Sequence, residues 1–256
     1  MNLRVITLHL FFIIFSISGY AQNTKEMRSE HFIITYAPEA EDCVYKVKDD
    51  AEYFYRKITQ EFGLVRDKMW SWDARTKILI AKNREEYLKN FSCPSWSTAC
   101  VDYHNRVIYT YPLQTGFSSI LLHELTHIIF REYIGYNRLP LWLDEGMATY
   151  IEYRDTTQCQ MLVASMKKVI EQNKYIKFSE INSTYSIASG SDTSLFYVQS
   201  FSMVYFLKER FGRDDFYEFI SYLRSGNSLD ESLRKAFRII ENTESFESNW
   251  KRFYSM

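Results

Sequence analysis

Residues 118–133 read SSILLHELTHIIFREY, an apolar segment that contains two histidines with a glutamate beside the first. Its composition and periodicity predict a helix, which we expect at residues 117–134. His123 and His127 are four residues apart, so they lie one above the other on the same face of that helix. Both imidazoles can therefore reach one metal ion, and Glu124 lies beside that face, where it can reach a water molecule without ligating the ion.

A third ligand is expected from the next helix. Residues 138–153 read RLPLWLDEGMATYIEY, in which Pro140 can open a helix after a turn. Glu145 follows His127 at a distance that allows the first helix to end, the chain to reverse and a second helix to pack alongside. Two histidines and one carboxylate leave a coordination position of Zn²⁺ open, which is typical of catalytic rather than structural zinc.

Two other carboxylates near Glu145 are alternative candidates for the third ligand, namely Asp144 and Glu152. Asp144 could instead orient a ligating histidine or favour the start of the helix. Gly146 and Ala148 are small, and we interpret them as allowing the two metal-bearing helices to approach closely.

The segments HELTH (123–127) and WLDEGMATY (142–150) together resemble the gluzincin metallopeptidases, especially the small bacterial peptidase MA-like family, whose pattern is HExxH, a short spacer and WLxEGxA. The second segment is also similar to aminopeptidase-N-like enzymes. The resemblance is good over residues 100–212. It implies a zincin-like α+β fold, one bound Zn²⁺ ion and a protein or peptide substrate.

The sequence lacks the GxMEN-type segment with which those aminopeptidases hold the amino terminus of a substrate, so exopeptidase action is not supported. Residues 106–111 (RVIYTY) occupy that region. The resemblance implies that this strand is the sheet edge that pairs with an extended substrate, although a strand of this composition could equally be internal. His104 precedes the strand and could line the cleft or lie on the surface.

A donor for the oxyanion often completes a hydrolytic zinc site. Related gluzincins place a tyrosine on a later helix in a Y-x-x-S-like context, which Tyr197 and Ser200 resemble. The resemblance therefore implies a catalytic role for Tyr197, whereas a structural role is the alternative in a chain with 20 tyrosines. We interpret Tyr205, elsewhere on that helix, as a core residue.

The rest of the chain predicts a small mixed sheet followed by a mainly helical lobe, with the site in a cleft between them. We expect one domain at 22–256, divided into an α/β part at 22–116 and a helical part at 117–256. The expected strands are 31–36, 76–81 and 106–111, and the expected helices are 39–63, 84–91, 117–134, 141–153, 156–173, 193–211, 213–225, 228–238 and 244–254.

Residues 1–21 have one basic residue, a short apolar stretch and small residues before Ala21, which is typical of a secretory signal peptide. We therefore expect a periplasmic or extracellular protein without stable membrane association, with a retained membrane anchor as the alternative. Export permits disulfides among the four cysteines, and Cys93 and Cys100 are the preferred pair because they bracket a short loop. Buried free thiols are the alternative.

The net charge is −1, with no basic excess, so a nucleic-acid partner is not expected. The function expected from the sequence is that of an exported zinc metallopeptidase with Glu124 as general base. Two alternatives stay open. One is a zinc-bearing binding domain without turnover, and the other is a zinc amidase that acts on cell-wall peptides or acyl amides.

Overall fold

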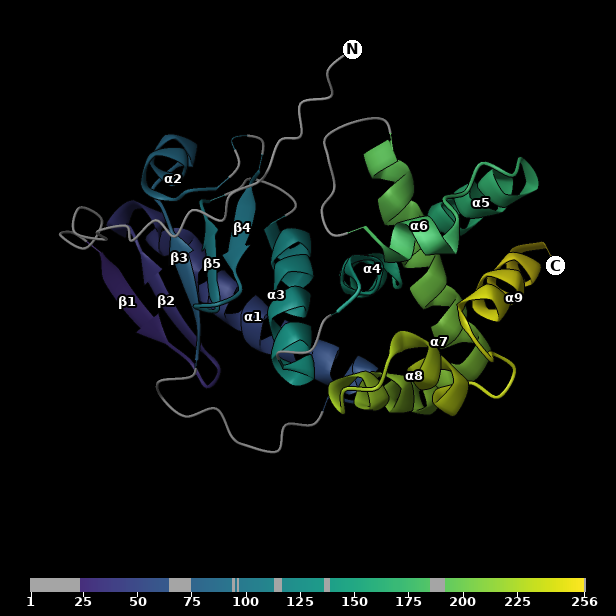
Figure 1. Cartoon of the computed structure of the whole chain (residues 1–256). Helices are drawn as coiled ribbons and strands as arrows, with labels where there is room; N and C mark the ends of the chain where they lie inside the picture. Colours follow the sequence, from purple (N-terminus) through teal and green to yellow (C-terminus); the bar gives the residue numbers. More distant parts are fainter. Residues whose placement is uncertain are drawn as a thin grey trace, which may run out of the picture.

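The computed structural model describes residues 24–64, 75–93, 95, 97–112, 117–135, 139–184 and 192–255. The expected signal peptide at 1–21 lies outside these residues. The described chain forms a sheet lobe and a helical lobe that stand side by side (Figure 1). Within these ranges no helix combines the length and the apolar composition needed to cross a membrane.

The sheet has five described strands in the order β1-β2-β3-β5-β4. The outer pairs β1/β2 and β4/β5 are antiparallel, whereas β2/β3 and β3/β5 are parallel, so the predicted mixed sheet is confirmed. Three strands were predicted, and the sequence analysis missed β1 and β4. The strands are β1 (Lys25–Arg28), β2 (Phe32–Tyr36), β3 (Thr76–Ile80), β4 (Ala99–Asp102) and β5 (Val107–Thr110).

The expectation that residues 106–111 form the sheet edge is wrong. That strand is β5, which lies between β3 and β4, and the edge beside the helical lobe is β4. β4 pairs with β5 through a short turn, so that Ala99 lies opposite Thr110 and Asp102 opposite Val107. The four residues ACVD are too few to show a clear alternation, which is why the pattern did not reveal them.

Two helices accompany the sheet. α1 (Glu41–Phe62) follows a short 3₁₀ turn (Pro38–Ala40) and packs its apolar stripe, which includes Val44 and Ile58, into the main core. α2 (Arg84–Asn90) begins at Asn83, whose side chain accepts a hydrogen bond from the backbone N–H of Glu86. The disulfide predicted between Cys93 and Cys100 is confirmed, whereas Cys43 and Cys159 are free.

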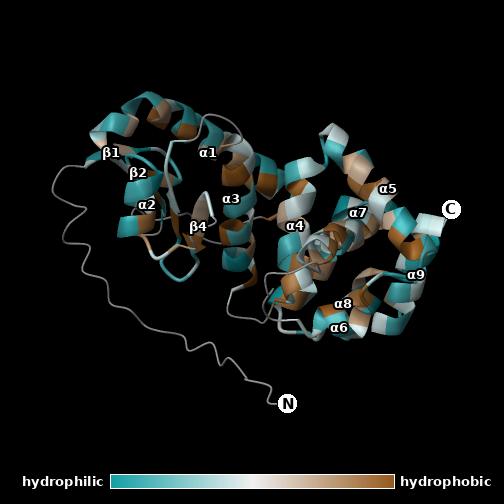
Figure 2. Cartoon of the chain, turned by 90° about the horizontal axis from the view of Figure 1, so that it is seen from above, coloured by the Kyte–Doolittle hydropathy of each residue, from teal (hydrophilic) through white to brown (hydrophobic). Residues whose placement is uncertain are grey.

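The helical lobe begins with α3, which contacts β4 and α1 on one side and α4 on the other. In Figure 2 hydrophobic residues (brown) recur along α3 and α4, and both helices are largely buried. The two helices predicted on either side of Gly212 form one element, α7, with a sharp break at that glycine (φ 85°). The elements are α3 (Phe117–Ile134), α4 (Leu141–Tyr153), α5 (Thr157–Glu171), α6 (Phe178–Asn182), α7 (Asp192–Arg224), α8 (Leu229–Ala236) and α9 (Thr243–Ser255).

Gly146 allows a close helix contact, but with a different partner from the one expected. A Cβ atom on Gly146 would lie 2.5 Å from the carbonyl oxygen of Ser200 and 2.8 Å from Cγ2 of Val204, both on α7. The expectation that this glycine lets α3 and α4 approach each other is therefore wrong. It lets α4 pack against α7, which supports the helix that carries Glu145.

Candidate metal centre

Three potential ligand atoms converge where α3 meets α4. Nε2 of His123 lies 3.2 Å from Nε2 of His127. Oε2 of Glu145, from α4, lies 3.7 Å from Nε2 of His123 and 3.6 Å from Nε2 of His127. Ligands about 2.0–2.1 Å from a tetrahedral Zn²⁺ ion are about 3.3 Å apart, so this triangle has the size that zinc requires.

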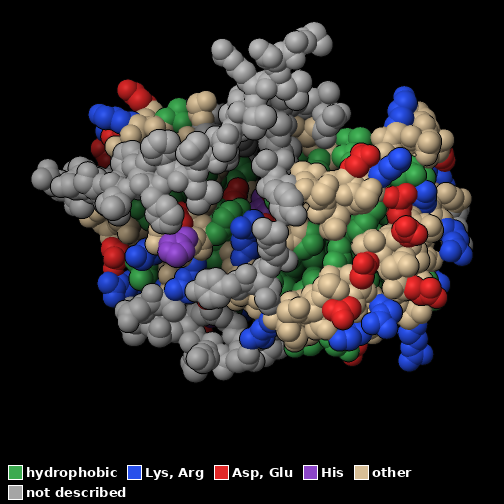
Figure 3. All heavy atoms as spheres, in the orientation of Figure 1, with side chains coloured by type: hydrophobic (Ala, Val, Ile, Leu, Met, Phe, Trp, Pro, Cys, Tyr) green, Lys and Arg blue, Asp and Glu red, His purple; other side chains and the backbone are tan. Residues whose placement is uncertain are grey.

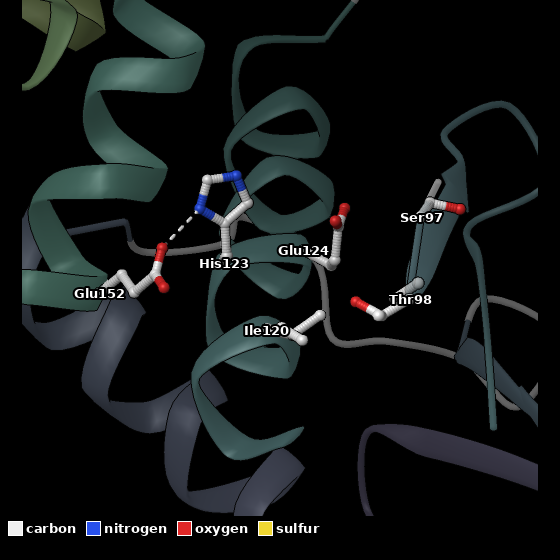
Figure 4. A pocket seen from close by; sticks show the side chains of 7 residues that line it. Ser97, Thr98, Ile120, His123, Glu124 and Glu152 are labelled. Carbon is white, nitrogen blue, oxygen red and sulfur yellow. Dashed lines mark hydrogen bonds and ion pairs between the residues drawn. The ribbon is translucent and has the colours of Figure 1, made fainter. Parts of the chain in front are cut away.

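Each histidine is oriented by a carboxylate on the nitrogen that faces away from the ligand triangle. Nδ1 of His123 lies 3.0 Å from Oε2 of Glu152 (Figure 4). The other oxygen of Glu152, Oε1, accepts a hydrogen bond from the Ser119 hydroxyl at 2.6 Å. Nδ1 of His127 lies 3.0 Å from Oδ1 of Asp144. With Nδ1 protonated, the Nε2 lone pair of each ring faces the triangle, which is how carboxylates orient zinc-binding histidines.

Asp144 and Glu152 thus occupy orienting positions rather than positions in the ligand triangle. Asp144 is 1% exposed, and its second oxygen, Oδ2, accepts hydrogen bonds from Nη2 and Nε of Arg131 at 2.6 and 2.9 Å. The buried negative charge is therefore paired on both sides, as a carboxylate in the interior requires. This matches the orienting role that the sequence analysis offered for Asp144 as an alternative.

The electrostatics of the site favour a cation. Burial lowers the pKa of His123, but Glu145 and Glu152 outweigh it and raise the pKa to about 10. Burial likewise lowers the pKa of His127, but the negative charge of Asp144 outweighs this effect, so the pKa is raised. Several carboxylates thus share a small volume with two imidazoles, and a divalent ion would relieve their mutual repulsion.

Glu124 lies next to the ligand triangle without belonging to it. In Figure 4 its side chain extends from α3 into a cavity on the side of Thr98, whereas His123 approaches Glu152 on α4. Burial raises the pKa of Glu124, and the neighbouring Glu145 acts in the same direction. A carboxylate with a raised pKa is a stronger base than an exposed one, which suits proton transfer from water.

The cavity that Glu124 enters has a volume of about 200 Å³. Its wall opposite α3 is formed by Ser97, Thr98 and Ala99, at the start of the edge strand β4. Ile120, one turn before Glu124, lies on the α3 side. A chain extended along β4 would place a side chain in this cavity, next to the candidate metal centre.

Tyr197 lies near the site on α7, half-buried. Burial, followed by the negative charges of Glu145 and Glu124, raises its pKa to about 12. Its hydroxyl therefore stays protonated at neutral pH and keeps its capacity to donate a hydrogen bond. Tyr205 is a packing residue as expected, with its ring against those of Phe201 and Tyr150.

The sequence analysis missed Tyr103 and Arg131. Tyr103, in the turn between β4 and β5, lies with its ring centroid 3.9 Å from the guanidinium carbon of Arg131 and 5.9 Å from the ring of His127. His104, the neighbour that the sequence analysis singled out, is exposed and lines the same cavity as Tyr103 and Arg131. One signal was available, because Arg131 follows His127 by four residues and so continues its face of α3.

The sequence of this chain matches the profile of a known protein family. The profile of the family described as the Peptidase MA superfamily matches residues 93–255, which include all the residues of the candidate centre. Comparison with curated protein sequences gives no match.

Three solved structures share the fold at low sequence identity. Yeast LTA4 hydrolase matches with a TM-score of 0.50 and 15% identity, over 90% of this chain and 36% of that one. An M1 zinc metallopeptidase from Deinococcus radiodurans matches with a TM-score of 0.53 and 13% identity, over 91% of this chain and 51% of that one. The structure of the CBM32 and M60 catalytic domains of Clostridium perfringens ZmpB matches with a TM-score of 0.50 and 14% identity. This match covers 91% of this chain and 24% of that one. This chain thus spans about half or less of each.

Proposed function

Because this chain belongs to the Peptidase MA superfamily, we propose that it is a zinc-dependent peptidase in which Glu124 activates the attacking water. The observation that carries the proposal is the triangle of His123 Nε2, His127 Nε2 and Glu145 Oε2 at the contact of α3 and α4. Two imidazoles and one carboxylate are the donor set of catalytic zinc, and the separations fit one ion.

The proposed roles follow from where each side chain lies. His123, His127 and Glu145 would hold the ion, which when bound supplies a Lewis acid that polarises the scissile carbonyl and acidifies the attacking water. Glu124 accepts a proton from that water and delivers it to the leaving amine. Tyr197 donates a hydrogen bond to the oxyanion as the carbonyl becomes tetrahedral.

Substrate would bind in an extended conformation along β4, the described edge of the sheet that contacts α3. The exposed backbone groups of an edge strand pair with a peptide in the way that another strand would. This places the scissile bond between β4 and Glu124, with one substrate side chain in the cavity bounded by Thr98 and Ile120.

Replacement of Glu124 by Gln tests the mechanism. We expect Glu124→Gln to bind zinc as the unchanged protein does and to lose activity by about 10²- to 10⁴-fold, because the base is removed while the ligands remain. Zinc content is measured by atomic absorption, and activity on denatured casein with and without a chelator.

Glu171→Gln, an exposed position on α5, is the matched control and should keep full activity. Hydrolysis by Glu124→Gln at the unchanged rate would exclude Glu124 as the base, and chelator-insensitive hydrolysis would exclude the metal. A protein that binds zinc but cuts peptidoglycan fragments rather than casein would be an amidase. One that binds zinc and cuts neither would be a binding domain.

A further inference from the structure

A second cavity lies beside the candidate centre, toward the C-terminal end of α3, with a volume of about 580 Å³. One wall is the turn between β4 and β5, with Tyr103 and Arg106, and the other includes Ile128 and Arg131 of α3. In Figure 3 a histidine side chain (purple) lies on the sheet lobe, and basic side chains (blue) lie nearer the boundary with the helical lobe.

The two cavities lie on either side of Glu124 along α3. Ile120, which lines the smaller cavity, precedes Glu124 by four residues, and Arg131, which lines the larger one, follows it by seven. At 3.6 residues per turn these offsets place all three side chains on one face of the helix. An extended chain bound along β4 would therefore reach the smaller cavity on one side of Glu124 and the larger cavity on the other.

Arg131 has donor capacity that the described part of the chain does not use. Its Nε and Nη2 donate to Asp144, and its guanidinium lies against the ring of Tyr103. Among the described residues none accepts a hydrogen bond from its Nη1, and the side chain is 39% exposed. The stacked ring and the paired carboxylate hold the planar group in place, so a ligand would meet a rigid donor.

The larger cavity is lined by more positive than negative charge. Arg106 and Arg131 line it together with a single carboxylate, that of Glu132. Glu132 accepts a hydrogen bond from Nη1 of Arg106 at 2.9 Å, so its charge is already paired. Arg131 is itself paired with Asp144, but only through Nε and Nη2, so its Nη1 edge is what the guanidinium can offer to a further carboxylate.

We infer that this cavity binds a carboxylate of the substrate through Arg131, so that the enzyme selects peptides carrying a carboxylate on one side of the scissile bond. The inference rests on the proposed function and names the substrate class for it. The carboxylate could belong to an Asp or Glu side chain or to the end of the peptide, because both offer the same planar pair of oxygens to the guanidinium.

A binding experiment separates recognition from turnover. Labelled peptides that differ only by Asp against Asn at successive positions, or by a free against an amidated C-terminus, are titrated by fluorescence anisotropy into the zinc-loaded Glu124→Gln protein. We expect one position to show about tenfold or tighter binding of the acid than of the amide. In the Glu124→Gln/Arg131→Gln protein the ratio should fall to near one.

We compare the ratio of the affinities for the acid and the amide peptide. Arg131→Gln also removes the support that Arg131 gives to Asp144, but this loss changes both affinities alike and leaves their ratio unaffected. Arg154 is the matched control, since it also pairs with a carboxylate, Glu61, and lies over a tyrosine ring, that of Tyr150 at 5.4 Å. Addition of Arg154→Gln should leave the acid preference unchanged. Equal binding of acid and amide at every position, or a preference that survives Arg131→Gln, would overturn the inference.

The outcome also distinguishes this inference from the proposed function. Acid-selective binding that depends on Arg131, in a protein whose unchanged form cuts no peptide, would remove the peptidase function and leave the recognition site. Cleavage of peptides by the unchanged protein, with equal binding of every acid and amide pair, would remove the recognition site and leave the peptidase function.

Discussion

The chain His127–Asp144–Arg131 shows how individual residues make the candidate centre possible. His127 is 2% exposed and Asp144 1%, so both would be costly to bury without partners. One oxygen of the Asp144 carboxylate lies 3.0 Å from Nδ1 of His127, and the other accepts hydrogen bonds from Arg131. The centre therefore depends on buried polar groups that orient each other, and not on the ligands alone.

The carboxylates behind the histidines should control zinc affinity. We expect Asp144→Asn and Glu152→Gln each to weaken zinc binding by about 10- to 100-fold, because the imidazoles lose orientation and basicity. Competition with a chromogenic chelator measures the dissociation constant. Asp214→Asn, whose side chain is 92% exposed, serves as the control. Unchanged affinity in both test variants would mean that the histidines need no such support.

At the residue scale, the sequence predicted the side chains whose spacing is periodic and missed those brought together by the turn. His123 and His127 could be named because helical spacing places them on one face, and Glu145 because it lies in the next expected helix, within WLDEGMATY. Tyr103 reaches Arg131 from the turn between β4 and β5, and no short-range pattern encodes that contact. The orienting role of Asp144 was one of two alternatives, since sequence cannot show which oxygen faces which nitrogen.

Among the elements, α4 positions Glu145 because it packs tightly against α7. A Cβ atom at Gly146 would lie 2.5 Å from the backbone oxygen of Ser200, which cannot move without moving α7. We expect Gly146→Ala to lower the free energy of unfolding by about 1–3 kcal/mol through overpacking. This loss should exceed the gain of about 1 kcal/mol from better helix propensity.

Urea unfolding followed by circular dichroism measures the effect of Gly146→Ala. Ser165→Ala, at an exposed position on α5, is the control and should change stability by no more than about 0.5 kcal/mol. Because Glu145 is the adjacent residue, Gly146→Ala should also weaken zinc binding. A variant as stable as the unchanged protein would show that α4 and α7 can separate at little cost.

The junction of β2 and α1 contains a hydrogen-bonded contact between His31 and the Glu52 carboxylate, whose pKa is lowered. Nδ1 of His31 lies 2.7 Å from Oε2 of Glu52, whose Oε1 accepts a hydrogen bond from the backbone N–H of His31 at 2.8 Å. Burial raises the pKa of Glu52, but the hydrogen bonds from His31 outweigh it and the pKa is lowered to about 2. The folded protein therefore favours the ionised carboxylate more than the unfolded chain does.

The contribution of Glu52 should be fully present above its ordinary pKa of 4.5 and be lost as the pH falls toward 2. We expect Glu52→Gln to lower the free energy of unfolding by about 1–2 kcal/mol at pH 7, with a difference that shrinks below pH 4.5. Glu41→Gln, which breaks the exposed pair with Lys25 on β1, should have little effect. A difference that stays constant from pH 7 to pH 2 would contradict this account.

Element boundaries followed the sequence where a long apolar stripe was present. The predicted helix at 141–153 is α4 to the residue, and the one at 117–134 is α3. Short elements gave too few turns or alternations to be read, which explains the omission of β1, β4 and α6. The position of β5 inside the sheet could not be predicted either, because it depends on the pairing of β4, which was not foreseen.

For the whole molecule, α3 links the two lobes. It contacts the edge strand β4 and α1 on the sheet side and α4 and α7 on the helical side, so the face with Glu124 lies between the lobes. The α+β class and the order of the lobes could be predicted, because a change from mixed periods to continuous helical periods marks the boundary. The shapes and charges of the two cavities could not, since they arise from contacts between distant segments.

The central claim is that His123, His127 and Glu145 hold one zinc ion between α3 and α4. Crystals of the zinc-loaded protein, measured at the zinc absorption edge, test it most directly. We predict one strong anomalous peak at about 2.0–2.2 Å from Nε2 of both histidines and from a Glu145 oxygen. A peak without Glu145 as ligand, or zinc bound only elsewhere, for example at His31 and Glu30, would contradict the claim.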